Sequence, residues 1–78
     1  MQTLERITQD PAVMGGKPCI RGMRVTVGAV VGQIGAGRSI ENILDDYPYL
    51  EREDIVACLR FAASQARREE FPIRRDAA

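Results

Sequence analysis

The sequence predicts a mainly α fold, in which a three-helix core of helix-turn-helix type follows a short N-terminal β-ribbon. From residue 27 onward, apolar side chains recur at helical spacing in three stretches, each with a cap or a stop signal. Residues 3–8 instead alternate weakly between apolar and polar side chains, as a strand does. The 78 residues, 45% of them hydrophobic, suffice for one small core. We therefore expect a single domain over residues 1–70, followed by a flexible tail over residues 71–78.

The segment over residues 10–26 is unusual because it combines two prolines, three glycines and three basic side chains. Glycine permits positive φ and proline fixes φ, so this segment needs a defined path. Its Ile-Arg-Gly-Met step indicates a tight turn at residues 20–23. We expect the strand over residues 3–8 to pair with a short strand around Arg24 and Val25. The three cations are either solvated side chains of a structural turn or a binding surface for anions.

The first helix is predicted over residues 27–36, with Thr26 as its N-cap and Gly37 as the glycine that ends it. Three interior glycines lie together on one face, each less favourable than alanine by roughly 0.8–1 kcal/mol. They are Gly28, Gly32 and Gly35. Either this face packs closely against another surface, or the helix is simply weak. A small core and the open edges of the ribbon also favour a partner surface, so we expect a homodimer.

The second helix is predicted over residues 40–47, because Ser39 can cap it and Pro48 stops it. The third is predicted over residues 52–68, with an apolar stripe that begins at Ile55. Carboxylates crowd its first turn, where the helix dipole favours them. We attribute them to that dipole and to solvation. They are Glu51, Glu53 and Asp54.

The charge distribution and the residue types present limit the classes of function that this chain can have. The net charge is zero, but residues 1–38 carry +3, residues 39–58 carry −5 and residues 59–78 carry +2. Histidine is absent and the two cysteines form no CxxC pair, so we expect no metal, no cofactor and no enzymatic activity. The sequence begins without a signal peptide and has no apolar run near the roughly 20 residues that a membrane span needs. We expect a cytoplasmic protein that does not enter membranes.

Several motifs, in order, resemble the DUF433 family. They are Asp10-Pro, Gly16-Lys-Pro-x-Ile-x-Gly-x-Arg-Val-x-Val, Gly37-x-Ser-x-Glu-x-Ile-x-x-x-Tyr-Pro-x-Leu and Glu53-Asp-Ile. The resemblance runs from about residue 7 to residue 66. It implies a homeodomain-like helix-turn-helix and an antitoxin that binds and inhibits a cognate PIN-like nuclease toxin.

Three departures from the family pattern are visible. Met23 and Glu51 stand where the family usually has threonine, and the first helix is richer in glycine than usual. The change at residue 23 removes a hydroxyl that could hold the turn, and the change at residue 51 weakens a helix cap. Neither change abolishes the fold.

DNA binding is a second expectation, possible for any helix-turn-helix but opposed here by charge. The recognition helix usually enters the major groove with its N-terminal part, which is acidic in this chain. We therefore expect binding to operator DNA, where it occurs, to use other cations, namely Lys17, Arg21, Arg24 and Arg38. A second basic patch on the third helix comprises Arg60, Ser64 and Arg67. A stand-alone DNA-binding regulator and a homo-oligomeric interaction module are the alternative functions.

The tail supplies candidate toxin-binding residues. Phe71 and Ile73 are apolar anchors, and Arg74 and Arg75 follow at once. A PIN-like nuclease holds its metal ions with carboxylates, and an arginine fork pairs well with a carboxylate. The tail therefore either delivers an arginine to the nuclease active site or is a frayed terminus without a partner.

Overall fold

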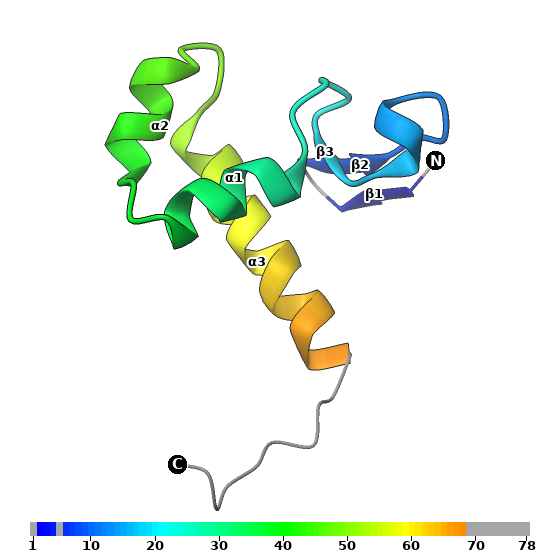
Figure 1. Ribbon diagram of the computed structural model, residues 1–78. Helices are drawn as coiled ribbons and strands as arrows, with labels where there is room; N and C mark the ends of the chain where they lie inside the picture. Colours follow the sequence, from blue (N-terminus) through cyan, green and yellow to red (C-terminus); the bar gives the residue numbers. More distant parts are fainter. Residues whose placement is uncertain (1, 5, 69–78) are drawn as a thin grey trace, which may run out of the picture.

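The computed structural model describes residues 2–4 and 6–68, with side chains for residues 6–67. It is mainly helical, with a small sheet before the helices, as predicted (Figure 1). The elements are β1 (Gln2–Leu4), β2 (Ile7–Gln9), the 3-10 turn η1 (Met14–Gly16), β3 (Cys19–Ile20), α1 (Val27–Gly35), α2 (Ile40–Asp46) and α3 (Arg52–Arg68).

The ribbon differs from the prediction. Residues 3–8 do not form one strand, because β1 and β2 pair with each other in an antiparallel hairpin, with Thr3 opposite Thr8. The second partner of β2 is β3 rather than a strand around residues 24–25, with Ile7 opposite Ile20. Both isoleucines are buried, so an apolar cross-strand pair accounts for this register. The weak alternation along residues 3–8 concealed the hairpin.

The three helices confirm the predicted elements to within one residue. Thr26 caps α1 by accepting a hydrogen bond from the Ala29 backbone N–H, and Gly37 follows the helix with a φ of 97°. Ser39 and Asn42 form a reciprocal capping box at the start of α2. Tyr47, which precedes Pro48, has left the helical region.

The core lies where α1 crosses the first half of α3 (Figure 1). Strand β2 also contacts α3. The buried apolar side chains of the described residues come from the sheet and from all three helices, with Leu50 from the turn before α3. They are Ile7, Cys19, Ile20, Val27, Val30, Ile43, Leu50, Ile55 and Cys58. Both cysteines are free and buried, as expected of reduced core residues.

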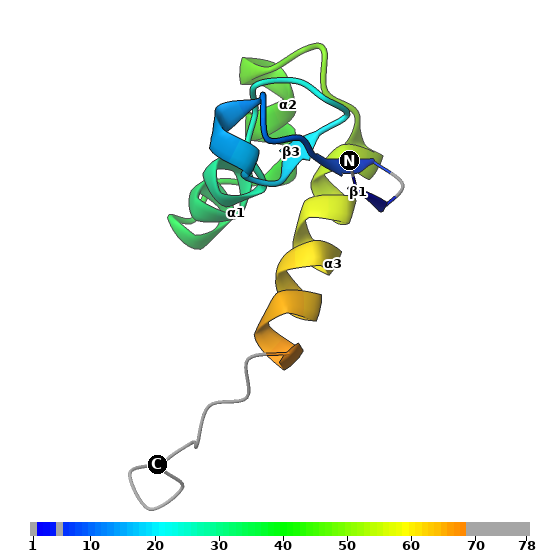
Figure 2. The same cartoon turned by 90° about the vertical axis from the view of Figure 1, so that its right-hand side faces the viewer.

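The second half of α3 projects away from this core, as both views show (Figures 1 and 2). The last buried side chain of the helix is Cys58, and none of residues 59–67 is buried. Among the residues that the structure describes, no helix is both long enough and apolar enough to cross a membrane.

No other described residue covers the glycine face of α1. A methyl group added at Gly28, Gly32 or Gly35 would meet no atom within 4 Å outside the helix itself. Within one described protomer, therefore, nothing packs closely against this face.

Candidate functional site

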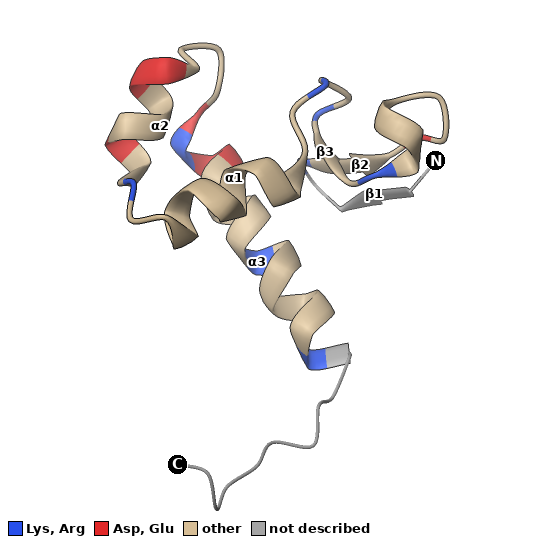
Figure 3. Cartoon of the chain, viewed as in Figure 1, with Lys and Arg blue, Asp and Glu red and all other residues tan. Residues whose placement is uncertain are grey.

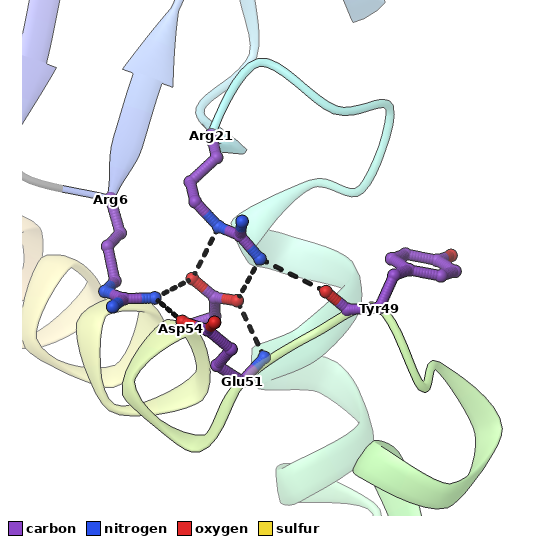
Figure 4. A network of polar contacts seen from close by, with 5 residues as sticks. All are labelled: Arg6, Arg21, Tyr49, Glu51 and Asp54. Atoms are coloured by element: carbon purple, nitrogen blue, oxygen red, sulfur yellow. Dashed lines mark hydrogen bonds and ion pairs between the residues drawn. The ribbon is translucent and has the colours of Figure 1, made fainter.

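The most concentrated chemistry of the described residues surrounds Asp54, which is 0% exposed. Its carboxylate accepts four hydrogen bonds (Figure 4). One comes from Arg6, two from Arg21 and one from the Glu51 backbone N–H. We call Arg6, Arg21, Glu51 and Asp54 the Asp54 cluster.

A tight turn directs Arg21 toward the carboxylate. The Met23 N–H donates to the Ile20 carbonyl at 2.7 Å, and the two central residues, Arg21 and Gly22, have φ values of 46° and 74°. These are the features of a type I′ turn, in which glycine at the second central position costs nothing. The Gly22 N–H also donates to Thr8 Oγ1, at 2.9 Å. The predicted turn at residues 20–23 is confirmed.

Arg6 reaches the same carboxylate from the ribbon. Its Nη1 lies 2.9 Å from Asp54 Oδ1 and 2.6 Å from Glu51 Oε1. The backbone carbonyl of Arg6 accepts a hydrogen bond from the Arg21 N–H at 2.8 Å. The two arginines are therefore joined to each other as well as to Asp54.

The start of α3 completes the cluster. Asp54 Oδ2 accepts from the Glu51 N–H at 2.8 Å, which is half of a capping box. Arg21 Nη2 donates to the Tyr49 carbonyl at 3.2 Å. The cluster thus fixes the turn between α2 and α3 as well as the ribbon.

Asp54 and its two arginine partners are charged at neutral pH. Burial by itself would raise the pKa of Asp54, but hydrogen bonds from Arg21, the Glu51 N–H and Arg6 outweigh it and lower that pKa. Hydrogen bonds to Glu51 and then to Asp54 raise the pKa of Arg6, and the bond to Asp54 raises that of Arg21. Burial, with a smaller contribution from the Asp54 charge, raises the pKa of the nearby Cys58 thiol to about 11.

One interpretation of the acidic first turn of α3 is wrong. We attributed Asp54 to the helix dipole and to solvation, but its side chain is fully buried and is neutralised by arginines. The Glu-x-x-Asp spacing of residues 51–54 matches half of a capping box, so it indicates the bond to the Glu51 N–H but not the burial or the arginine partners.

The four candidate DNA-binding cations are not gathered in one patch. Arg21 belongs to the Asp54 cluster, and Arg38 bonds to Asp46 Oδ2 at 2.6 Å. Arg38 also bonds to Gln33 Oε1 and to the Asn42 carbonyl, so it closes the turn between α1 and α2. Lys17 and Arg24 are exposed and form no ion pair within the described residues. Basic segments lie at both ends of α1 (Figure 3).

On α3, Arg60 and Arg67 are exposed and Ser64 is half-buried, so the second basic patch is accessible at its two arginines. The four candidate toxin-binding residues, Phe71, Ile73, Arg74 and Arg75, lie outside the described residues. In the part of the chain that the structure describes, no three Cys, Asp or Glu side chains are grouped to hold a metal ion.

The fold and the cluster define a small three-helix domain whose N-terminal ribbon is tied to its third helix. The chain belongs to the DUF433 family, described as a protein of unknown function, whose model matches residues 7–62. The match includes Arg21, Glu51 and Asp54, whereas Arg6 lies one residue before it.

A relative from Sinorhizobium fredii (strain NBRC 101917 / NGR234), "Uncharacterized protein y4eO", is 41% identical over 51 residues. The aligned region covers 65% of this chain and 23% of that protein, so the chain spans less than a quarter of the relative's length. No solved structure matches the chain.

Proposed function

We propose that this chain is a non-catalytic, antitoxin-like protein of the cytoplasm that binds and inhibits a cognate PIN-like nuclease. The observation that supports this function is the length of α3. The helix has 17 residues, but its buried side chains end at Cys58, so its last turns project beyond the core. An exposed helical arm of this kind is suited to a partner protein rather than to the stability of its own domain.

The arm has the chemistry of a docking element. A helical segment that projects from its domain has only marginal stability in water. The second half of α3 is supported by good helix formers such as alanine, arginine and glutamine. Phe61 is partly buried against the core, whereas Leu59 is half-exposed and Arg60 and Arg67 are exposed. Apolar side chains interleaved with arginines fit a partner that has an apolar groove beside a carboxylate cluster.

Co-expression with a PIN-like nuclease encoded beside this chain tests the proposal. We expect co-purification of the two proteins and loss of nuclease activity in the complex. The double substitution Arg74→Ala and Arg75→Ala should relieve inhibition, whereas Lys17→Ala with Arg24→Ala should leave it unchanged. Failure of the wild-type chain to bind or inhibit the nuclease would remove the antitoxin function.

Operator DNA is a second candidate partner, favoured by Lys17 and Arg24, which are exposed and form no ion pair with another described residue. The charge objection to α3 as the reading helix is smaller than the sequence indicated. Glu51 and Asp54 are paired with arginine, so within the described first turn only Glu53 is an exposed carboxylate without an ion pair. Gel-shift titration with DNA from upstream of the gene tests this partner.

A further inference from the structure

The strands β2 and β3 contribute three buried apolar side chains. They are Ile7 in β2 and Cys19 and Ile20 in β3, whereas Thr8 and Gln9 are partly exposed. The helices also bury side chains of their own in the core, among them Val30, Ile43 and Ile55.

The Asp54 cluster attaches the ribbon to α3. The segment at β3 is also bonded to the start of α1, where the Val27 N–H donates to the Pro18 carbonyl at 2.9 Å. Arg6 comes from the link between β1 and β2, Arg21 from the turn after β3, and both bond to the same carboxylate on α3 (Figure 4). Two further bonds unite the ribbon with that turn, from the Arg21 N–H to the Arg6 carbonyl and from the Gly22 N–H to Thr8 Oγ1. The ribbon and the turn are thus one unit, and Asp54 holds that unit on α3.

We propose that Asp54 is a clasp and that the ribbon opens from α3 as a unit while the three helices stay packed. Proteins open locally at a lower free energy than they unfold, and the segment that opens is one with few buried apolar contacts. The ribbon packs against α3 less extensively than α1 does, and the Asp54 cluster holds it there together with Ile7 and Ile20.

Opening changes the surface of the protein. In the closed form Arg6 and Arg21 are neutralised by Asp54 and Glu51, and Ile7 and Ile20 are covered. In the open form the two guanidinium groups and the two isoleucines become available together. This inference does not depend on the proposed nuclease partner, because it concerns the isolated chain.

Amide hydrogen exchange measured by NMR at neutral pH tests the clasp. The reporters of the ribbon are the Arg21 and Gly22 amides, which donate to Arg6 and Thr8. These bonds lie within the unit that opens, and they lose protection on opening because so small a sheet is marginal once its apolar face has left the core. The reporter of the helical core is the Ile43 amide, which donates to Ser39 at 3.2 Å. In Arg6→Gln we expect protection of the ribbon amides to fall by about tenfold, the scale of one lost charged hydrogen bond. Protection at Ile43 should change by less than about twofold.

Two further variants keep the test decisive. Asp54→Asn should give a larger loss of protection at the same ribbon amides. If Asp54→Asn does not fold, Arg6→Gln decides the test alone, because Arg6→Gln leaves the contact between Arg21 and Asp54 intact. Glu53→Gln, an exposed neighbour with no bond to the cluster, should alter neither set. An equal loss at ribbon and core amides in Arg6→Gln would overturn the proposal, since the cluster would then only stabilise the whole fold. No loss at the ribbon amides would overturn it as well, because Ile7 and Ile20 would suffice to hold the ribbon.

Discussion

Arg21 and Asp54 meet through two parallel hydrogen bonds, from Nε to Oδ1 at 3.0 Å and from Nη2 to Oδ2 at 2.7 Å. The two residues are 33 positions apart, so this contact joins the N-terminal third of the chain to α3. Only the planar fork of arginine matches a carboxylate in this way, and lysine would offer one donor point. Arg21 is therefore engaged by the fold itself, and its substitution affects the structure before it affects any ligand.

Asp54→Asn should lower the free energy of unfolding by about 2–3 kcal/mol, because a buried carboxylate that receives charged hydrogen bonds is replaced by an amide. The matched control is Glu53→Gln, at an exposed site one residue away, which should change stability by no more than about 0.5 kcal/mol. Urea denaturation of both variants measures the difference. If Asp54→Asn were as stable as Glu53→Gln, the hydrogen bonds to Asp54 would make no net contribution to the stability of the fold.

Acid should destabilise the protein through the same carboxylate. The pKa of Asp54 is lowered in the folded state, so its contribution is present above the unfolded value of about 3.9 and is lost as pH falls through the folded value. We expect the urea midpoint to be steady from about pH 7 to pH 5 and to fall below about pH 4. Asp54→Asn should flatten that fall.

Glu41 is the control for the acid experiment. Its pKa is also lowered, by the hydrogen bond from Arg52, but the side chain is exposed. Exposed ion pairs contribute little, so Glu41→Gln should leave most of the acid dependence in place. If instead Glu41→Gln flattened the curve and Asp54→Asn did not, the acid-sensitive group would lie in the pair between α2 and α3.

The helices could be predicted because their signals are local. Ser39, Thr26 and Pro48 mark helix ends within a few residues of the side chains that they affect, and apolar spacing defines the buried faces. The Asp54 cluster could not be predicted in the same way, since its members come from three segments joined only by the tertiary fold. A carboxylate in the first turn of a helix already has a local explanation in the helix dipole, and that explanation concealed the burial of Asp54.

The ribbon was predicted, but its strand pairing was missed for a related reason. Residues 3–8 alternate weakly enough to suit one strand, and the hairpin is settled by the pairing of Ile7 with Ile20 across the sheet. The turn at residues 20–23, in contrast, is a local structure, and its Arg-Gly centre was sufficient to predict it.

Alanine substitution should change the stability in opposite directions at Gly28, inside α1, and at Gly37, just after α1. Gly28→Ala should stabilise the chain by about 0.8–1 kcal/mol, because the site is helical and the added methyl group meets no other atom. Gly37→Ala should destabilise it by about 1 kcal/mol, because φ is 97° there. Thermal melts of the two single variants provide the comparison. Stabilisation by both would show that Gly37 is free to leave its left-handed conformation.

The open glycine face also tests the expected homodimer. If a second copy packs against this face, Gly32→Leu should shift a dimer toward monomer in sedimentation velocity runs at high micromolar concentration. Arg67→Leu, on the distal turns of α3, serves as the matched bulky control and should leave the dimer intact. A wild-type chain that sediments as a monomer at that concentration would contradict the homodimer, and a dimer insensitive to Gly32→Leu would place its interface elsewhere.

Binding to operator DNA, where it occurs, should depend on Lys17 and Arg24, since the other two candidates are held in ion pairs by Asp54 and Asp46. Replacing Lys17 and Arg24 by alanine should weaken retention about equally on all sequences, because phosphate contacts carry no base information. It should also reduce the dependence of affinity on salt by about one unit of slope per lost contact. Gel shifts at several salt concentrations measure both effects.

Glu53→Gln should leave DNA binding unchanged or tighten it, because the substitution removes the remaining unpaired carboxylate from the described first turn of α3. If Glu53→Gln abolished sequence preference while the substitutions at Lys17 and Arg24 had no effect, α3 would be the reading helix, and the charge of its first turn would serve recognition rather than oppose it.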